Sequence, residues 1–201
     1  MKSIIVNATA LRADGALTIL HQFLDAIPDD QFEYIIFVDD TVTNIKPKQN
    51  VRIIKKKTVS FFSRFIWDLF GLQHCLNKHL IKPIVAISLQ NTNFRLNTKC
   101  SNFIYYHQSV PLYPYKWNPF KPEESKLWFY KNIYPIFVKL LINSRTEIFV
   151  QQNFIKESFS LKYKFPKNKI HVVFPSFSIP KFNQEYIGSS NNSDKLVISY
   201  N

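Results

Sequence analysis

The strongest constraint on the fold is an alternation between short apolar runs and segments with helical periodicity. Residues 3–8 (SIIVNA) and 32–38 (FEYIIFV) are rich in β-branched and aromatic residues, which is typical of buried strands. Between them, Leu17, Leu20 and Leu24 recur at helical spacing. Strands that alternate with helices form a parallel sheet covered on both faces. The chain is therefore expected to be an α/β protein, a Rossmann-like three-layer domain with a mainly parallel sheet.

The alternation continues through most of the chain. Further strands are expected at residues 51–54, 84–88, 102–106, 147–150 and 170–174, and further helices at residues 60–80, 123–143 and 153–163. Pro135 lies inside the second of these helices, where it removes a backbone hydrogen-bond donor, so it should kink the helix.

The C-terminal end of the chain has a different composition. The 201 residues suffice for one domain of ordinary size, which we expect over residues 1–187. Residues 188–194 (GSSNNSD) are small and polar, as in a linker, and residues 195–200 (KLVISY) resemble an opening strand. Residues 188–201 are therefore expected to be a linker and the first strand of a C-terminal domain that this chain lacks.

The charge and the cysteines limit the classes of partner. The formal net charge is +12, which favours anionic partners such as acidic membrane surfaces or phosphorylated substrates. No nucleic-acid-binding motif accompanies the basic residues, so no nucleic-acid partner is expected. No apolar run reaches the ~18 residues of a membrane-spanning helix. Cys75 and Cys100 lack zinc-site spacing, and we expect two reduced thiols without a disulfide.

Two segments mix lysines with aromatic side chains. They are residues 61–82 and 113–139. Amphipathic segments of this composition are typical of a surface that lies on a membrane. The alternative, that the aromatic side chains pack into the core of the domain, stays open.

Polar residues follow the predicted strands, at the edge where parallel sheets bind ligands. His107 comes directly after the strand at 102–106, and an imidazole there can bind a substrate hydroxyl or transfer a proton. A histidine satisfied by a neighbouring loop is the alternative. Gln90, Asn91 and Gln108 are further candidate contacts at strand ends. No serine or cysteine is arranged with a histidine as a nucleophile and its base.

The turn after the first strand contains Asp14, Gly15 and Ala16, which are candidate substrate contacts. A glycine there lets a ligand approach the backbone, although it can also serve the turn alone. The G-x-G-x-x-G fingerprint is missing, which disfavours a dinucleotide site. Asp39 and Asp40 follow the second strand, where such a site keeps its ribose-binding acid; without the fingerprint we expect them in a solvated turn. Neither acid belongs to a metal-binding motif.

Seven stretches share one further pattern and occur in order along nearly the whole chain. They are residues 4–20 (IIVNATALRADGALTIL), 64–76 (RFIWDLFGLQHCL), 87–93 (ISLQNTN), 105–119 (YYHQSVPLYPYKWNP), 126–134 (KLWFYKNIY), 148–155 (IFVQQNFI) and 170–178 (IHVVFPSFS). Together they resemble the N-terminal half of a bacterial family 4 (group 1) glycosyltransferase with the GT-B architecture, of the kind used in capsule or lipopolysaccharide assembly.

The resemblance implies a function for the whole enzyme. This domain would bind the acceptor, a cell-envelope glycan or a lipid-linked acceptor, at the cytoplasmic face of the membrane. A C-terminal domain absent from this chain would hold the nucleotide-sugar donor without a metal or other cofactor. In such a retaining reaction the leaving phosphate assists departure and the acceptor hydroxyl attacks the same face. The isolated half is expected to be inactive.

The resemblance also assigns residues. His107 matches the active-site histidine of the family, which contacts the transferred sugar. Gly15 matches the glycine loop after the first strand, although Asp14 replaces the usual second glycine. Residues 175–178 (PSFS) depart from the P-N-G-V-like segment of the family, and the two glutamates of the donor domain are absent.

Two functions of other kinds stay open. One is a non-catalytic module that binds an anionic membrane or polymer through its positive charge. The other is a nicotinamide-dependent oxidoreductase, which should bind its cofactor without a further domain.

Overall fold

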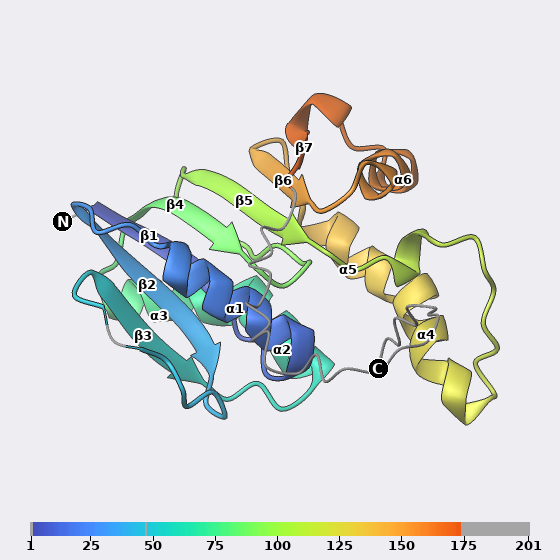
Figure 1. Cartoon of the computed structure of the whole chain (residues 1–201), viewed down its shortest axis with the longest axis horizontal. Coiled ribbons are helices and arrows are strands. Elements are labelled where there is room, and N and C mark those ends of the chain that lie inside the picture. Colours follow the sequence, from blue (N-terminus) through green and yellow to red (C-terminus); the bar gives the residue numbers. More distant parts are fainter. Residues whose placement is uncertain (1, 47, 174–201) are drawn as a thin grey trace, which may run out of the picture.

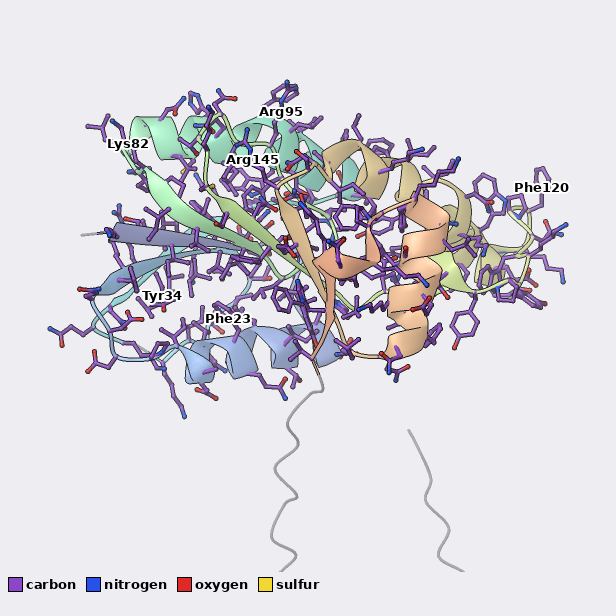
Figure 2. All side chains as sticks on the ribbon, turned by 90° about the horizontal axis from the view of Figure 1, so that it is seen from above. Phe23, Tyr34, Lys82, Arg95, Phe120 and Arg145 are labelled. Atoms are coloured by element: carbon purple, nitrogen blue, oxygen red, sulfur yellow. The ribbon has the colours of Figure 1, made fainter. Side chains whose placement is uncertain are left out.

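The computed structural model describes residues 2–46 and 48–173, and Figure 1 shows their arrangement. These residues form a seven-stranded sheet of order β3-β2-β1-β4-β5-β6-β7, with parallel pairing throughout. Helices cover both faces of the sheet (Figures 1 and 2). The predicted Rossmann-like α/β domain is thereby confirmed. The linker and strand expected at 188–201, and the segment 175–178, lie outside the described residues.

Each predicted strand forms at or within a few residues of its expected position. The strands are β1 (Lys2–Ala8), β2 (Phe32–Asp39), β3 (Val51–Lys56), β4 (Pro83–Ser88), β5 (Ser101–Tyr106), β6 (Thr146–Val150) and β7 (Ile170–Val172). β1 and β2 are interior strands buried on both faces, with Ile5 opposite Ile35 in the register. Their continuous apolar runs reflect this double burial.

The helices follow the strands in the expected order. They are α1 (Asp14–Ala26), α2 (Phe61–Ile66), the π-helical segment η1 (Trp67–Gly71), α3 (Leu72–Lys78), α4 (Pro122–Asn132), α5 (Tyr134–Leu141) and α6 (Asn153–Tyr163), with short 3₁₀ turns η2 (Val110–Leu112) and η3 (Lys167–Lys169). No helix in the described part of the chain has both the length and the apolar character that crossing a membrane requires.

Two of the predicted helices differ from simple α-helices. The helix expected at 60–80 contains the π-helical segment η1 in its middle. The helix expected at 123–143 is divided into α4 and α5 at Ile133, two residues before Pro135. Pro135 has no N–H group and its ring crowds the preceding turn, so the regular hydrogen bonding ends there.

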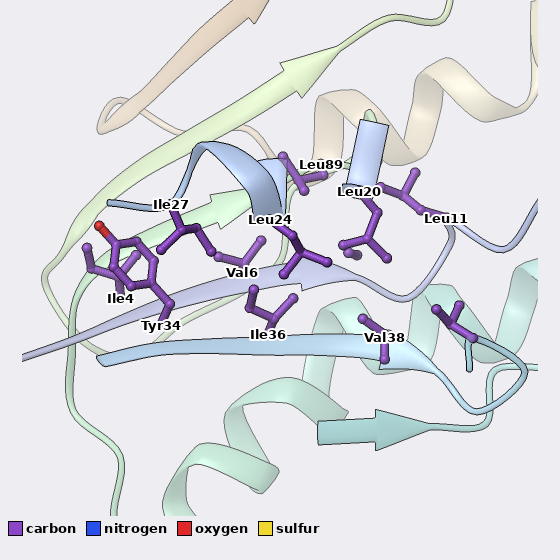
Figure 3. Packing of buried hydrophobic residues seen from close by; sticks show 12 residues of the cluster. Ile4, Val6, Leu11, Leu20, Leu24, Ile27, Tyr34, Ile36, Val38 and Leu89 are labelled. Atoms are coloured by element: carbon purple, nitrogen blue, oxygen red, sulfur yellow. The ribbon is translucent and has the colours of Figure 1, made fainter. Parts of the chain in front are cut away.

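One face of the sheet is covered by α1. Leu20 and Leu24 of this helix pack against Val6 and Ile36 of the central strands, and all four side chains are buried (Figure 3). Burial of one such side chain contributes about 1.5–3 kcal/mol. These contacts fix α1 directly after β1, so the loop between them is held at the carboxyl edge of the sheet.

The opposite face is covered by the remaining helices. Leu72 and Leu76 of α3 pack near Ile5 of the sheet, in one buried cluster. Val138 of α5 and Phe159 of α6 belong to a second cluster beneath β5 and β6. In Figure 2, α1 lies on one side of the strands, and α3 and α5 lie on the other. The helices α2 and α5 thereby reach the carboxyl edge of the sheet.

Candidate functional site

A cavity of about 180 Å³ opens at the carboxyl edge of the central strands. Three loops that follow β1, β4 and β5 and the helices α2, η1, α4 and α5 contribute to its wall. The lining residues are Ala10, Leu11, Ala16, Phe61, Arg64, Phe65, Asp68, Gln90, Asn91, Thr92, His107, Gln108, Tyr130, Tyr134 and Phe137. Its wall is therefore polar at the strand ends and aromatic on the helical side, as in sites for small polar ligands.

The structure brings most of the predicted site residues to this cavity. Gln90, Asn91, His107 and Gln108 all line it, because β4 and β5 are neighbouring parallel strands whose carboxyl ends meet. Ala16, at the start of α1, lines it as well. These placements show proximity; the roles predicted for the residues remain predictions.

Asp14 and Gly15 lie outside the cavity wall. Both residues are exposed at the first turn of α1. Asp14 takes a left-handed conformation with φ of 51°, whereas Gly15 does not have a positive φ. A Cβ on Gly15 would meet no atom within 4 Å, so the structure shows no close backbone approach at this glycine.

His107 is held by Asn91. The side-chain Oδ1 of Asn91 accepts hydrogen bonds from the backbone N–H groups of His107 (2.6 Å) and Gln108 (2.9 Å). These two bonds fix the orientation of the amide, so its Nδ2 faces His107 Nε2 at 3.1 Å. Nδ2 can only donate, and Nε2 must therefore accept without a proton. The proton of the neutral imidazole lies on Nδ1.

The imidazole of His107 is neutral at physiological pH. Burial lowers its pKa to about 4, since desolvation disfavours the charged ring. The contact with Asn91 acts in the same direction, because a protonated Nε2 would face the N–H groups of the amide. The Nδ1 atom of His107 is buried and has no hydrogen-bond partner among the described residues. His107 therefore contributes a neutral ring rather than a positive charge to the cavity wall.

Asp68 forms the second polar centre of the cavity wall. Its Oδ1 accepts hydrogen bonds from Asn7 Nδ2 (2.8 Å) and Gln90 Nε2 (2.9 Å), and its Oδ2 from Thr92 Oγ1 (3.1 Å). Burial raises its pKa to about 7 although these hydrogen bonds and the charge of Arg64 lower it. The carboxyl group can therefore gain or lose a proton near neutral pH.

Gln90 connects Asp68 to the loop after β1. Its Oε1 accepts hydrogen bonds from the backbone N–H of Ala10 (3.0 Å) and from Thr9 Oγ1 (3.2 Å), while its Nε2 donates to Asp68. Tyr134 Oη donates to the backbone carbonyl of Gln90 at 3.4 Å. Both ends of the Gln90 side-chain amide are thus hydrogen-bonded to buried polar groups, and these bonds hold this wall of the cavity rigid.

The π-helical segment η1 carries Asp68 into the site. Trp67, the residue before it, packs against Phe37 of β2 with ring centroids 5.5 Å apart, and its Nε1 donates to Asn7 Oδ1 at 3.3 Å. A Cβ on Gly71 would lie 2.7 Å from the Trp67 ring, so this position requires glycine. Single π-helical turns of this kind are frequent at functional sites.

Sequence reasoning missed Asp68 and Arg64. Both lie in the stretch that was expected to be an ordinary amphipathic helix or a membrane-facing segment. One signal was available: Asp68 is the single acidic residue among residues 60–82. The aromatic residues Phe61, Phe65 and Phe137 belong to the two segments that mix lysines with aromatic side chains, and the structure places them in the cavity wall.

The prediction that Asp39 lies in a solvated turn is wrong. Asp39 is buried, with 1% of its surface exposed, and it forms an ion pair with Arg12 Nη2 at 3.0 Å. Its carboxylate also accepts hydrogen bonds from Thr41 Oγ1 (2.7 Å) and Thr58 Oγ1 (3.1 Å). Burial alone would raise the pKa of Asp39, but the hydrogen bonds and the Arg12 charge outweigh it and lower the pKa. Asp40 is exposed, as expected.

The titratable groups limit the chemistry of the site. Within residues 2–46 and 48–173, no group of three or more His, Cys, Asp or Glu side chains is placed to hold a metal ion. Cys75 and Cys100 are both free thiols. The cavity offers a neutral imidazole, a carboxyl group with a raised pKa, a guanidinium and several amides. Such a set can bind and orient hydroxyl groups and can exchange protons with them.

No known protein-family model matches the chain, and no curated protein matches it in sequence.

Proposed function

We propose that the chain is the acceptor-binding domain of a retaining glycosyltransferase. In this proposal a separate domain supplies the nucleotide sugar, and the acceptor is a cell-envelope glycan or a lipid-linked acceptor at the cytoplasmic face of the membrane. The observation that carries the proposal is the cavity at the carboxyl edge of the sheet, which His107, Gln90 and Asp68 all line. The resemblance of seven ordered stretches to family 4 glycosyltransferases supports the same conclusion.

The chemistry of the cavity suits a carbohydrate. Sugar hydroxyl groups both donate and accept hydrogen bonds, and the wall provides Arg64 as a donor and Gln108 as both a donor and an acceptor. The aromatic residues Tyr130 and Phe137 provide apolar faces for sugar C–H groups. In the proposed reaction Nε2 of the neutral His107 ring stays bound to Asn91, and the Nδ1–H group donates a hydrogen bond to a sugar hydroxyl and orients the sugar. The carboxyl group of Asp68 fixes the amide of Gln90, which faces the same space.

The missing glycine fingerprint argues against the oxidoreductase alternative. Gly15 follows β1 with no second glycine. Asp39 lies at the ribose-binding position of a dinucleotide fold, but its carboxylate is already bound by Arg12 and two threonines. A ribose would have to displace these partners. Fluorescence titration of the chain with NADH and NADPH should therefore show no saturable binding, and saturable binding would favour the oxidoreductase.

The test of the proposal is a transfer assay. The chain, together with the separate domain proposed to bind the nucleotide sugar, is incubated with labelled nucleotide sugars and an extracted lipid and glycan fraction. We expect label to enter the acceptor fraction. His107→Ala should lower turnover on the order of 100-fold, the size of effect produced by loss of one preorganised hydrogen-bonding group.

The matched control is His74→Ala. His74 lies on α3, is exposed and does not line the cavity. It should retain normal turnover, and circular dichroism should show that both variants keep the fold. Normal turnover of His107→Ala would refute the role of His107, and absence of transfer with every nucleotide sugar would refute the proposed function.

A further inference from the structure

Five large apolar side chains are exposed on neighbouring helices. They are Phe62 (65% exposed), Ile66 (59%), Phe70 (61%), Ile136 (59%) and Leu140 (64%). The first three lie on α2 and η1 and the last two on α5, and we call this surface the α2–α5 face. Single exposed apolar residues are ordinary on proteins, but a contiguous group indicates an interaction surface.

The α2–α5 face is continuous across the two helices. On each helix the exposed residues recur every four positions, so they share one side. The helices pack together through Phe137, whose ring lies 4.3 Å from that of Phe65 and 4.9 Å from that of Phe61, between centroids. Phe70 and Leu140 line one groove of about 660 Å³ between η1 and α5.

The groove has a basic rim. Arg95 and Arg145 line it together with the apolar residues, both are exposed, and neither forms an ion pair with a described residue. Figure 2 shows the two arginines on the side of the sheet opposite Phe23 of α1. The one acidic residue of α2, η1 and α5 is Asp68, which is buried. The α2–α5 face therefore combines exposed apolar side chains with positive charge and lacks exposed acids on its helices.

We propose that the α2–α5 face docks on a membrane surface that contains anionic phospholipids. Phe62, Ile66 and the other exposed apolar side chains enter the boundary between headgroups and acyl chains, and Arg95 and Arg145 contact lipid phosphate groups. Amphipathic helices with aromatic and aliphatic residues on one side and basic residues beside them bind membranes in this way. Membrane binding is thereby assigned to the α2–α5 face, and this assignment does not depend on the transfer reaction.

The charges and the apolar side chains of the α2–α5 face disfavour a second copy of the chain and a nucleic acid as its partner. In a symmetric dimer through this face, Arg95 and Arg145 of each copy would find no exposed acidic residue on α2, η1 or α5 of the other copy as a partner. A nucleic acid would meet five apolar side chains in place of the polar groups that bind phosphate. A bilayer satisfies the apolar and the basic residues at once.

The docked face and the candidate site share two helices. Phe61 and Phe65 of α2 and Phe137 of α5 line the cavity, while the exposed residues of the same helices form the α2–α5 face. Docking would therefore hold the cavity close to the bilayer. In the proposed function this is where a lipid-linked acceptor would be bound, and this last step alone rests on that proposal.

Co-sedimentation of the 201-residue chain with vesicles tests the inference. We use vesicles of phosphatidylcholine alone and vesicles in which about one-third of the lipid is phosphatidylglycerol, the anionic probe. Binding to the second kind should be at least about ten-fold tighter. It should weaken when salt is raised from about 0.1 M to about 0.5 M, because salt screens the arginine–phosphate attraction.

Variants identify the face. The double change Ile66→Ser/Ile136→Ser should lower partitioning into anionic vesicles at least about ten-fold. Arg95→Gln/Arg145→Gln should reduce the preference for phosphatidylglycerol. The matched control is Phe120→Ser: Phe120 is 92% exposed and lies at the far end of the molecule in Figure 2, away from Arg95 and Arg145. Partitioning of this control should be unchanged.

Several outcomes would overturn the inference. It fails if anionic vesicles do not bind the chain, or if Phe120→Ser lowers binding while the double isoleucine variant does not. It also fails if sedimentation velocity shows a dimer that Ile66→Ser/Ile136→Ser abolishes, because the face would then contact a second copy. All measurements are made without a sugar donor, so they are independent of the transfer assay.

Discussion

Asn91 holds His107 by both ends of its side-chain amide: Oδ1 accepts the backbone N–H of His107 at 2.6 Å, and Nδ2 lies 3.1 Å from the imidazole Nε2. The amide thereby dictates which ring nitrogen carries the proton. Asn91 itself has a φ of 65°, a left-handed conformation that asparagine and aspartate tolerate better than most residues. One residue of the loop after β4 thus sets both the position and the protonation state of the residue that follows β5.

Asn91→Asp should raise the pKa of His107 from about 4 to its ordinary value near 6.5 or above. One carboxylate oxygen can still accept the two backbone N–H groups. The other replaces the donating Nδ2, so Nε2 must carry a proton to form the hydrogen bond, and the negative charge favours the imidazolium. Titration of the ring nitrogens by NMR measures this pKa directly.

The control for this change is Gln108→Glu. It adds the same charge one residue after His107, where the side chain makes no hydrogen bond with the imidazole. The pKa of His107 should rise much less in this variant. If Asn91→Asp leaves the pKa near 4, the hydrogen bond between Asn91 and Nε2 does not determine the state of the ring.

Asp68→Asn should make the stability of the protein increase more steeply with pH between about 4 and 7. Burial raises the pKa of Asp68 to about 7, so the folded protein binds a proton in this range that the unfolded chain has released. The unfolding free energy falls as pH rises wherever the folded state binds more protons. Asparagine does not titrate and removes this contribution. His107 contributes in the opposite direction and still does so in this variant. Its lowered pKa makes the folded state more stable as the pH rises to about 6.5.

Urea unfolding at several pH values measures the slope. The matched control is Asp14→Asn, which removes the same charge at an exposed position of α1. Its unfolding free energy should follow the wild-type pH profile. An Asp68→Asn profile identical to the wild type would contradict the raised pKa.

The grouping of Gln90, Asn91, His107 and Gln108 could be predicted from the sequence. Apolar runs identify the strands, and in a parallel sheet polar residues that follow two strands come to the same edge. Their hydrogen bonds could not be predicted, because they depend on the conformation of the loop after β4. The left-handed φ of Asn91, which turns its amide toward the next strand, leaves no pattern in the sequence.

Asp68 and Asp39 show a second limit of sequence reasoning. The period of 3.6 residues predicts a helix through residue 68, but it does not show that Asp68 is buried, where Asn7 and Thr92 bind it. Asp39 and Asp40 directly follow a predicted strand, which is typical of a turn, and the partner of Asp39, Arg12, is distant in the sequence. Both acids are buried because tertiary contacts supply hydrogen bonds that a local pattern does not contain.

Gly71→Ala should destabilise the protein by about 1–3 kcal/mol, the usual cost of overpacking a core. The new Cβ would lie 2.7 Å from the ring of Trp67, which is buried and packed against Phe37. The ring must shift, which weakens the hydrogen bond from Trp67 to Asn7. Urea unfolding measures the loss of stability, and indole NMR shifts report the displacement of Trp67.

The control is Gly15→Ala. A Cβ on Gly15 meets no atom within 4 Å, and the residue lies in the first turn of α1 without a positive φ. Alanine favours the helix, so this variant should be neutral or more stable by up to about 1 kcal/mol. Equal losses of stability in the two variants would contradict the close packing of Gly71 on Trp67.

Arg12→Met should lower stability by about 1–2 kcal/mol at neutral pH, less than for a fully buried ion pair because 32% of the Arg12 side chain is exposed. Asp39 would keep Thr41 and Thr58 as partners but lose the charge that helps lower its pKa. A lowered carboxyl pKa stabilises the folded state above the unfolded value near 4, and this contribution is lost as pH falls through the folded value. The variant should therefore unfold at a higher pH during acid titration followed by circular dichroism. The control is Arg52→Met, which removes an exposed arginine from β3 and should leave the pH midpoint of acid unfolding almost unchanged. An equal shift of the midpoint in both variants would show that net charge, rather than the Arg12–Asp39 pair, sets the stability in acid.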